Sequence, residues 1–241
     1  MDEQETPIQA QIPRLSRAMK TVAAVLGVVW LLEVLLQGTG IGGMRGPMGP
    51  FEALALVPAS VIQRGRAWQL VTYALLHDPS NALGLVVTVI SLWFAGSPLE
   101  RLWGPRRVLM LLGVATLVGG VTVMGAGALV ASIYTGLTVS PAAANTALLA
   151  AWCRLHAREQ LSFFGLATLT GARLLGFSVA FSAVQFAWQR SGAGAAALVG
   201  FAVGWVFAST PRDVGAAPRR RTESGPRFRV IQGGGGRDLP N

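Results

Sequence analysis

Few residues in this 241-residue chain carry side chains suited to chemistry, and several of them lie within apolar stretches. The chain has two histidines, His77 and His156, and a single cysteine, Cys153, so it has no internal disulfide. No cluster of His, Cys, Asp and Glu has metal-ligand spacing, and we therefore expect no metal site and no cofactor. Ser140 directly precedes Pro141, a pattern typical of a helix N-cap, because the hydroxyl accepts from unpaired backbone N–H groups.

Three further polar residues lie within or beside the apolar runs. Glu33 interrupts the first run near its far end, and an ionisable residue inside a membrane span is a candidate functional group. We expect Glu33 to reach water, because it lies close to the membrane interface. Asn145 is expected to donate a hydrogen bond between helices. Asp78 and Pro79 predict a helix start directly after His77, which makes His77 a polar loop residue near the interface.

The composition indicates a membrane protein. Hydrophobic residues make up 52% of the chain and charged residues only 13%, against about a quarter charged in soluble domains. The apolar runs predict an all-α polytopic membrane fold with six transmembrane helices. The expected spans are residues 21–37, 82–96, 108–131, 141–153, 174–188 and 193–208. The fourth is short for a span, so we expect it to begin within the membrane.

Three parts follow from this pattern. We expect a polar N-terminal tail over 1–20, a membrane domain over 21–209, and a disordered tail rich in Arg and Gly over 210–241. Within the long first loop, the apolar segment 53–62 is predicted to lie in the interface plane. Residues 160–173 resemble an interfacial turn more than a span.

The net charge of +9 is interpreted through the position of the basic residues. Six spans place both termini on one side. Of twenty Lys and Arg residues, only Arg45, Arg64, Arg66 and Arg190 fall on the other side. Because basic residues are enriched in cytoplasmic loops, both termini are predicted to be cytoplasmic. The basic excess therefore indicates topology and contact with anionic lipid, and we expect no nucleic-acid partner.

Four stretches resemble the rhomboid family of six-span intramembrane serine proteases and their inactive relatives. They are LVPASVIQRGRAWQLVTYALLH, FAGSPLERLWGPRRVLML, TVSPAAANTALLAAW and ALVGFAVG, and the similarity covers about residues 20–210. The first two resemble the family's first loop and the Glu-Arg-x-x-Gly exit of its second span. The resemblance implies a rhomboid-like six-helix bundle whose short fourth helix starts mid-membrane at the bottom of a water-filled cavity.

The resemblance also implies positions for the chemistry. It places Ser140 at the nucleophile position and Ala197 at the position of the base histidine, so the base is missing. A serine hydroxyl is a weak nucleophile without a base within hydrogen-bond reach. The family's oxyanion-stabilising pair falls at Gly84 and Thr88, and neither residue type supplies that function. His77 is an alternative base for Ser140, but its position outside the helix argues against this role.

Gly200 and Gly204 form a GxxxG pattern in the sixth predicted span, which favours close helix packing. We therefore expect a rhomboid-like pseudoprotease of the bacterial cytoplasmic membrane that binds transmembrane segments of client proteins without cleaving them. Two alternatives stay open. One is an intramembrane serine endopeptidase using Ser140, and the other is a structural membrane subunit that recruits a partner through its C-terminal tail.

Overall fold

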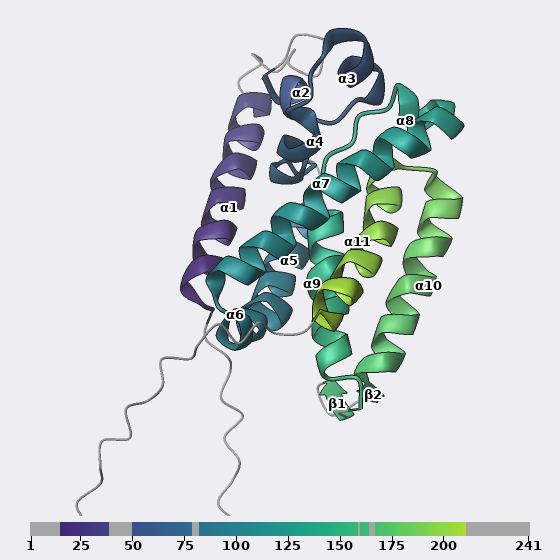
Figure 1. Cartoon of the computed structure of the whole chain (residues 1–241). Helices are drawn as coiled ribbons and strands as arrows, with labels where there is room; N and C mark the ends of the chain where they lie inside the picture. The colour runs from purple at the N-terminus through teal and green to yellow at the C-terminus, as the bar shows by residue number, and fades with distance from the viewer. Residues whose placement is uncertain (1–14, 39–49, 79–81, 159, 164–166, 211–241) are drawn as a thin grey trace, which may run out of the picture. The chain divides into compact units, whose positions relative to one another are not determined.

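The computed structural model describes residues 15–38, 50–78, 82–158, 160–163 and 167–210 (Figure 1). The chain divides into two units, Met1–Thr210 and Pro211–Asn241, and the described residues all belong to the first. Most of the predicted N-terminal tail and nearly all of the predicted C-terminal tail therefore fall outside the described residues.

The described part is predominantly helical, with one small antiparallel hairpin. Its elements are α1 (Arg17–Gly38), α2 (Pro50–Leu54), α3 (Pro58–Arg64), α4 (Gln69–Thr72), the 3-10 turn η2 (Tyr73–Leu75), α5 (Ala82–Ser91), the π-helical turn η3 (Leu92–Gly96), α6 (Ser97–Trp103), α7 (Pro105–Leu129), α8 (Ala131–Tyr134), α9 (Ala142–Leu155), β1 (Gln160–Phe163), β2 (Ala167–Thr170), α10 (Gly171–Gln189) and α11 (Gly192–Ser209). The hairpin β1–β2 occupies the stretch predicted as an interfacial turn.

Four helical stretches among the described residues are long and apolar enough to cross a membrane. They are Arg17–Leu36, Ala82–Trp103, Pro105–Leu129 and Gly192–Ser209. The predicted polytopic membrane class is supported, but six spans are not confirmed. Helix α9 has 14 residues, or about 21 Å at 1.5 Å per residue, which is shorter than a bilayer core of about 30 Å.

Helix α9 is the central helix of the membrane unit. It contacts α7, α10, α11 and η3, and in Figure 1 it lies behind α11. Most of its buried residues are alanines, including Ala143, Ala147 and Ala150. Small side chains let neighbouring helices approach closely, which explains how a short helix is surrounded on several sides.

The second predicted span does not end at residue 96 but continues to Trp103 through η3. Pro98 has no backbone N–H, so its place in a helix leaves an upstream carbonyl without its usual donor. The Ser97 hydroxyl donates to the Leu92 carbonyl at 3.2 Å. The Ser97 backbone N–H donates to the same carbonyl, which closes the wider π turn directly before the proline and lets the helix continue past it.

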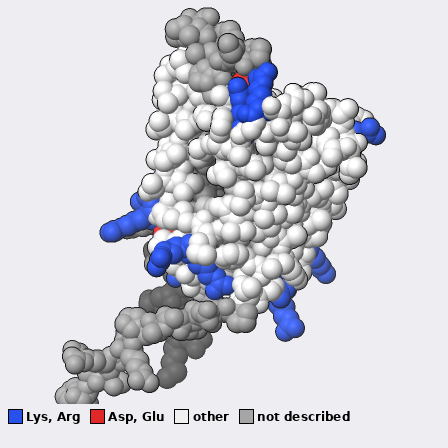
Figure 2. All heavy atoms as spheres, turned by 45° about the horizontal axis from the view of Figure 1, so that its top comes forward, with Lys and Arg blue, Asp and Glu red and all other residues white. Residues whose placement is uncertain are grey.

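Basic side chains gather at the two ends of the membrane unit. On the face seen in Figure 2, an uncharged band separates them, as expected for a surface in contact with lipid. Arg107 at the start of α7 donates to the carbonyls of Phe207 and Thr210, each at 3.2 Å. Its guanidinium also lies 4.9 Å from the ring centroid of Trp103. Arg107 thereby caps the C-terminal end of α11.

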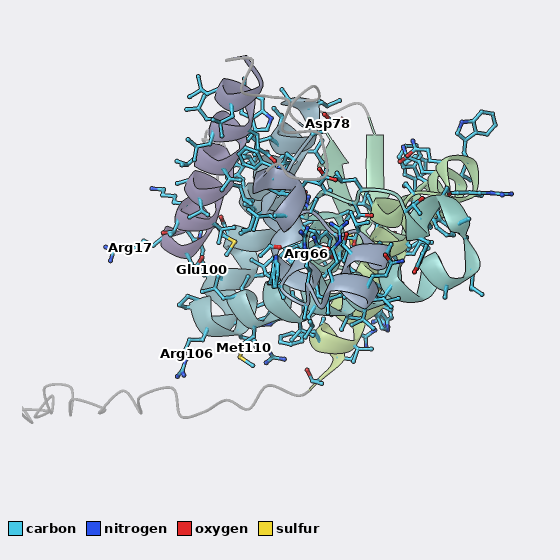
Figure 3. The ribbon with its side chains drawn as sticks, turned by 90° about the horizontal axis from the view of Figure 1, so that it is seen from above. Arg17, Arg66, Asp78, Glu100, Arg106 and Met110 are labelled. Atoms are coloured by element: carbon cyan, nitrogen blue, oxygen red, sulfur yellow. The ribbon has the colours of Figure 1, made fainter. Side chains whose placement is uncertain are left out.

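The N-terminus of α1 is held by a carboxylate from α6. Glu100 accepts from the backbone N–H groups of Ala18 and Met19, each at 3.3 Å, and from the Ser16 hydroxyl. The Ser16 backbone N–H donates to the Ser97 hydroxyl at 3.2 Å. Figure 3 shows Glu100 next to the start of α1. The negative charge faces the positive end of the helix dipole, so the charged end of the second span joins α6 to α1.

The segment predicted to lie in the interface plane forms the short helices α2 and α3. The fully buried Gln69 side chain fixes this segment, because it accepts from the Val57 backbone N–H and donates to the Ala53 carbonyl, both at 3.3 Å. The Trp68 indole N–H donates to the same carbonyl at 2.9 Å. Gln69 of α4 and Trp68 directly before it therefore provide hydrogen-bond partners for backbone groups that the irregular segment does not pair itself.

Candidate functional site

Four polar side chains from four parts of the chain meet inside the membrane unit. They are Glu33 of α1, His77 before α5, Thr88 of α5 and Asn145 of α9, and we call them the polar cluster. Glu33, His77 and Thr88 are 4%, 3% and 2% exposed, and Asn145 is half-buried. Buried polar groups within a membrane are costly unless they are hydrogen-bonded, so their meeting is a candidate functional feature.

Glu33 enters the cluster through the buried face of α1. Met19, Leu26 and Glu33 are seven residues apart, close to two helical turns, so their side chains share one face. All three are buried. The expectation that Glu33 reaches water is therefore wrong. Glu33 lies on the face of α1 that packs against the other helices, and this decides its burial even near the end of the helix.

His77 links α1 to α5. Its backbone N–H donates to Oε2 of Glu33 at 3.3 Å, and its ring Nε2 lies 3.2 Å from Oγ1 of Thr88. The prediction that His77 precedes the helix is confirmed, since α5 begins at Ala82. His77 lies in a loop as predicted, but its ring is buried over the first turns of α5. A Cβ placed on Gly84 would lie 4.0 Å from Cδ2 of His77.

Thr88 carries three hydrogen bonds on one oxygen. Its hydroxyl donates to the Gly84 carbonyl at 2.9 Å, and Asn145 Nδ2 donates to Oγ1 at 2.9 Å. The predicted interhelical role of Asn145 is confirmed. Because the single hydroxyl hydrogen is directed to Gly84, the contact with His77 requires a proton on Nε2 of the imidazole. The other ring nitrogen, Nδ1, is buried without a hydrogen-bond partner in the described part of the chain.

The electrostatics of His77 follow from its burial. Burial lowers the pKa of His77, and the Leu75 backbone opposes that shift. The imidazole is therefore neutral near pH 7. It does not activate Thr88 as a nucleophile, because the Thr88 hydroxyl hydrogen points to a backbone carbonyl. The cluster leaves Nδ1 as the ring position for a further proton, which is taken up at lower pH than by an ordinary histidine, and it is not suited to forming a covalent intermediate.

Ser140 lies in a different environment. Its backbone N–H donates to the Tyr73 carbonyl at 3.2 Å, and its φ of 133° is in the region that favours glycine. The N-cap of α9 is Pro141, with no side-chain cap, so the expected N-cap role of Ser140 is wrong. Among the hydrogen bonds of the described residues, none joins Ser140 to His77, whose Nε2 is directed to Thr88.

The backbone conformation of Ser140 gives a direct prediction. Replacing Ser140 with glycine is expected to raise the apparent free energy of unfolding by about 1 kcal/mol, because glycine adopts positive φ without strain. Ser140→Ala retains the Cβ and is expected to show no gain. Thermal unfolding of both variants in detergent checks this. Equal shifts in the two variants would mean that the hydroxyl, and not the backbone, determines the effect.

The position predicted for the missing base lies at the α9–α11 contact. The Ala197 carbonyl accepts from the Thr146 hydroxyl of α9 at 2.8 Å. Gly200 and Gly204 follow on the same side of α11, and a Cβ on Gly204 would lie 2.1 Å from the Ala147 carbonyl oxygen. This face of α11 is therefore filled by α9 and leaves no room for a larger side chain at the two glycines.

An apolar groove lies on the other side of α11, between α7 and α10, and we call it the α7–α10–α11 groove. It encloses about 450 Å³ and is lined by Thr122, Gly125, Ala126, Phe186, Ala195, Leu198 and Val199. A Cβ on Gly125 would meet no atom within 4 Å. The sequence pattern does not distinguish Gly125 from the glycines of α7 that pack closely against other helices, such as Gly119 and Gly120.

The comparisons with known proteins place the chain in a family. The family described as "Eukaryotic integral membrane protein (DUF1751)" matches residues 20–211, and no curated protein matches the chain. The assignment to the rhomboid family is therefore wrong, because the family shown is a different one. The expected bacterial cytoplasmic membrane is also wrong, since this family is eukaryotic, while the membrane localisation itself is supported. As the match spans most of the chain, this protein belongs to the DUF1751 family of eukaryotic integral membrane proteins.

Proposed function

We propose that this protein is a noncatalytic membrane scaffold that binds an apolar transmembrane helix of a client protein in the α7–α10–α11 groove. The observation that carries the proposal is the groove itself, an open apolar space with Gly125, Ala126 and Ala195 along it. In a membrane, helices associate through close van der Waals packing, and small residues permit the shortest approach. The groove supplies such a surface.

The chemistry of the groove favours an apolar occupant. Thr122 is the one polar side chain among its lining residues, and its hydroxyl already donates to the Val118 carbonyl at 2.9 Å. A polar ligand would therefore lose hydrogen bonds to water without regaining them. A volume of about 450 Å³ suits several side chains of a helix that lies alongside, with Phe186 as one wall.

Binding without cleavage is supported by the state of the groups that were candidates for catalysis. Nε2 of His77 contacts Thr88, and Thr88 directs its hydrogen to the backbone. Ala197, which has no ionisable group, uses its carbonyl to bind Thr146. An activated nucleophile needs a base within hydrogen-bond reach, and the described residues present no serine paired in this way.

Site-specific photocrosslinking tests this function. A benzophenone side chain at Val199, inside the groove, is expected to crosslink a synthetic transmembrane peptide rich in leucine and glycine in phosphatidylcholine vesicles. The same probe at Val87, an exposed residue of α5, is expected to react several-fold less. Gly125→Phe is expected to abolish the Val199 crosslink, because the aromatic ring fills the groove. Mass spectrometry of the recovered peptide reports whether it stays intact.

Gly113→Phe is the matched control, because a Cβ on Gly113 also meets no atom within 4 Å, but this glycine of α7 does not line the groove. Loss of crosslinking in both variants would contradict binding in the groove, and a cleaved peptide would contradict the noncatalytic part of the proposal. Removal of residues 211–241 is expected to leave the crosslink unchanged. If the crosslink instead disappears, the C-terminal tail is the recruiting element.

A further inference from the structure

We propose that the polar cluster is a proton-sensitive clasp, which holds α1 and α5 against α9 at neutral pH and opens when His77 takes up a proton. The proposal rests on three hydrogen bonds that join different elements. Glu33 to His77 links α1 to the segment before α5, His77 to Thr88 links that segment to α5, and Asn145 to Thr88 links α5 to α9.

The bond between His77 and Thr88 is the step at which protonation acts. Nε2 of His77 already carries a hydrogen, because the Thr88 oxygen has no hydrogen left to give it. A second proton therefore goes to Nδ1, which is buried and has no hydrogen-bond partner among the described residues. The resulting imidazolium carries a buried positive charge, which the Leu75 backbone offsets only in part.

The charged groups around the ring determine its movement. Glu33 of α1 faces His77, and Asp78 follows it in the chain and lies close enough to Glu33 for their charges to interact. The α5 and α9 side chains of the cluster, Thr88 and Asn145, are neutral. The imidazolium is therefore drawn toward the Asp78 carboxylate and away from Thr88. This movement breaks the link to α5 and α9.

The direction of the pH effect follows from the lowered pKa of His77. The closed clasp binds this proton more weakly than an unfolded chain, whose histidine has a pKa of about 6.5. The stability that the clasp contributes is therefore complete above about pH 6.5 and is lost as the pH falls toward the lowered pKa.

Hydrogen exchange measured by mass spectrometry tests the clasp in the full-length protein in detergent, at about pH 7.5 and about pH 5.5, on either side of the ordinary histidine pKa. After correction for the intrinsic pH dependence of exchange, residues 29–36 and 82–91 are expected to lose protection several-fold at the lower pH. His77→Gln is expected to show no such change. His156→Gln is the matched control, because His156 is the one other histidine of the chain, and it is expected to respond like the unaltered protein.

A second pair of variants decides the matter if His77→Gln does not fold. Thr88→Val removes the shared oxygen. It is expected to show, at both pH values, the reduced protection from hydrogen exchange that the unaltered protein shows only at the lower pH. Thr88→Ser keeps the hydroxyl and is expected to retain the pH response. The proposal is overturned if His77→Gln responds to acid as the unaltered protein does, if the unaltered protein does not respond, or if the two Thr88 variants respond alike.

Discussion

Gly204→Ala is expected to lower the apparent free energy of unfolding of the membrane unit by about 3 kcal/mol, the upper end of the usual cost of overpacking. A Cβ on Gly204 would lie 2.1 Å from the carbonyl oxygen and 2.8 Å from the Cα of Ala147. These are backbone atoms of α9, so no side-chain rotation relieves the clash. Helix α9 would have to move, and its other neighbours restrict that movement. Thermal unfolding in detergent, followed by tryptophan fluorescence, measures the loss.

Gly113→Ala on α7 is the control for this substitution. Gly113 is an exposed helical glycine, and a Cβ there meets no atom within 4 Å. Alanine is expected to leave stability unchanged or to raise it slightly, because it has the higher helix propensity. Similar losses at Gly113 and Gly204 would show that the contact with α9 is not the cause.

Glu100→Ala is expected to lower the apparent free energy of unfolding by about 2 to 3 kcal/mol. The carboxylate accepts from Ala18 and Met19 and from the Ser16 hydroxyl, and bonds to a charged group contribute more than neutral ones. Its removal leaves unpaired N–H groups at the start of α1. Thermal unfolding gives the loss in stability, and hydrogen exchange of residues 16–22 is expected to show fraying of the first turn.

Glu100→Gln separates the charge from the hydrogen bonds. The amide oxygen still accepts, but the favourable interaction of a negative charge with the helix dipole is lost. We expect about half of the loss seen with alanine. If neither variant changes stability or the exchange of α1, this carboxylate does not hold α1 in the way the contacts indicate.

The long apolar helices were predictable from the sequence because length and uniform apolarity define them. The predicted runs at 21–37, 108–131 and 193–208 correspond to α1, α7 and α11, with ends that differ by a few residues. The continuation of the second span to Trp103 was not predicted. Gly96 and Pro98 ordinarily indicate a helix end, and the π turn with its Ser97 bond depends on contacts that a linear pattern does not contain.

The polar cluster was predictable only in part. The seven-residue spacing of Met19, Leu26 and Glu33 was available from the sequence and indicates one shared face. The burial of His77 was not, because it depends on how α1, α5 and α9 meet. The family assignment failed because it relied on four short stretches and on matching single residues, whereas the family match extends over residues 20–211.

The shared oxygen of Thr88 has a consequence for how this region tolerates sequence change. Because three partners depend on one atom, the contribution of each depends on the presence of the others, and their separate effects do not sum. A substitution at one position therefore changes how substitutions at the other positions affect stability. Relatives are therefore expected to inherit the group as a unit or to replace it as a unit, with few viable intermediates between the two states.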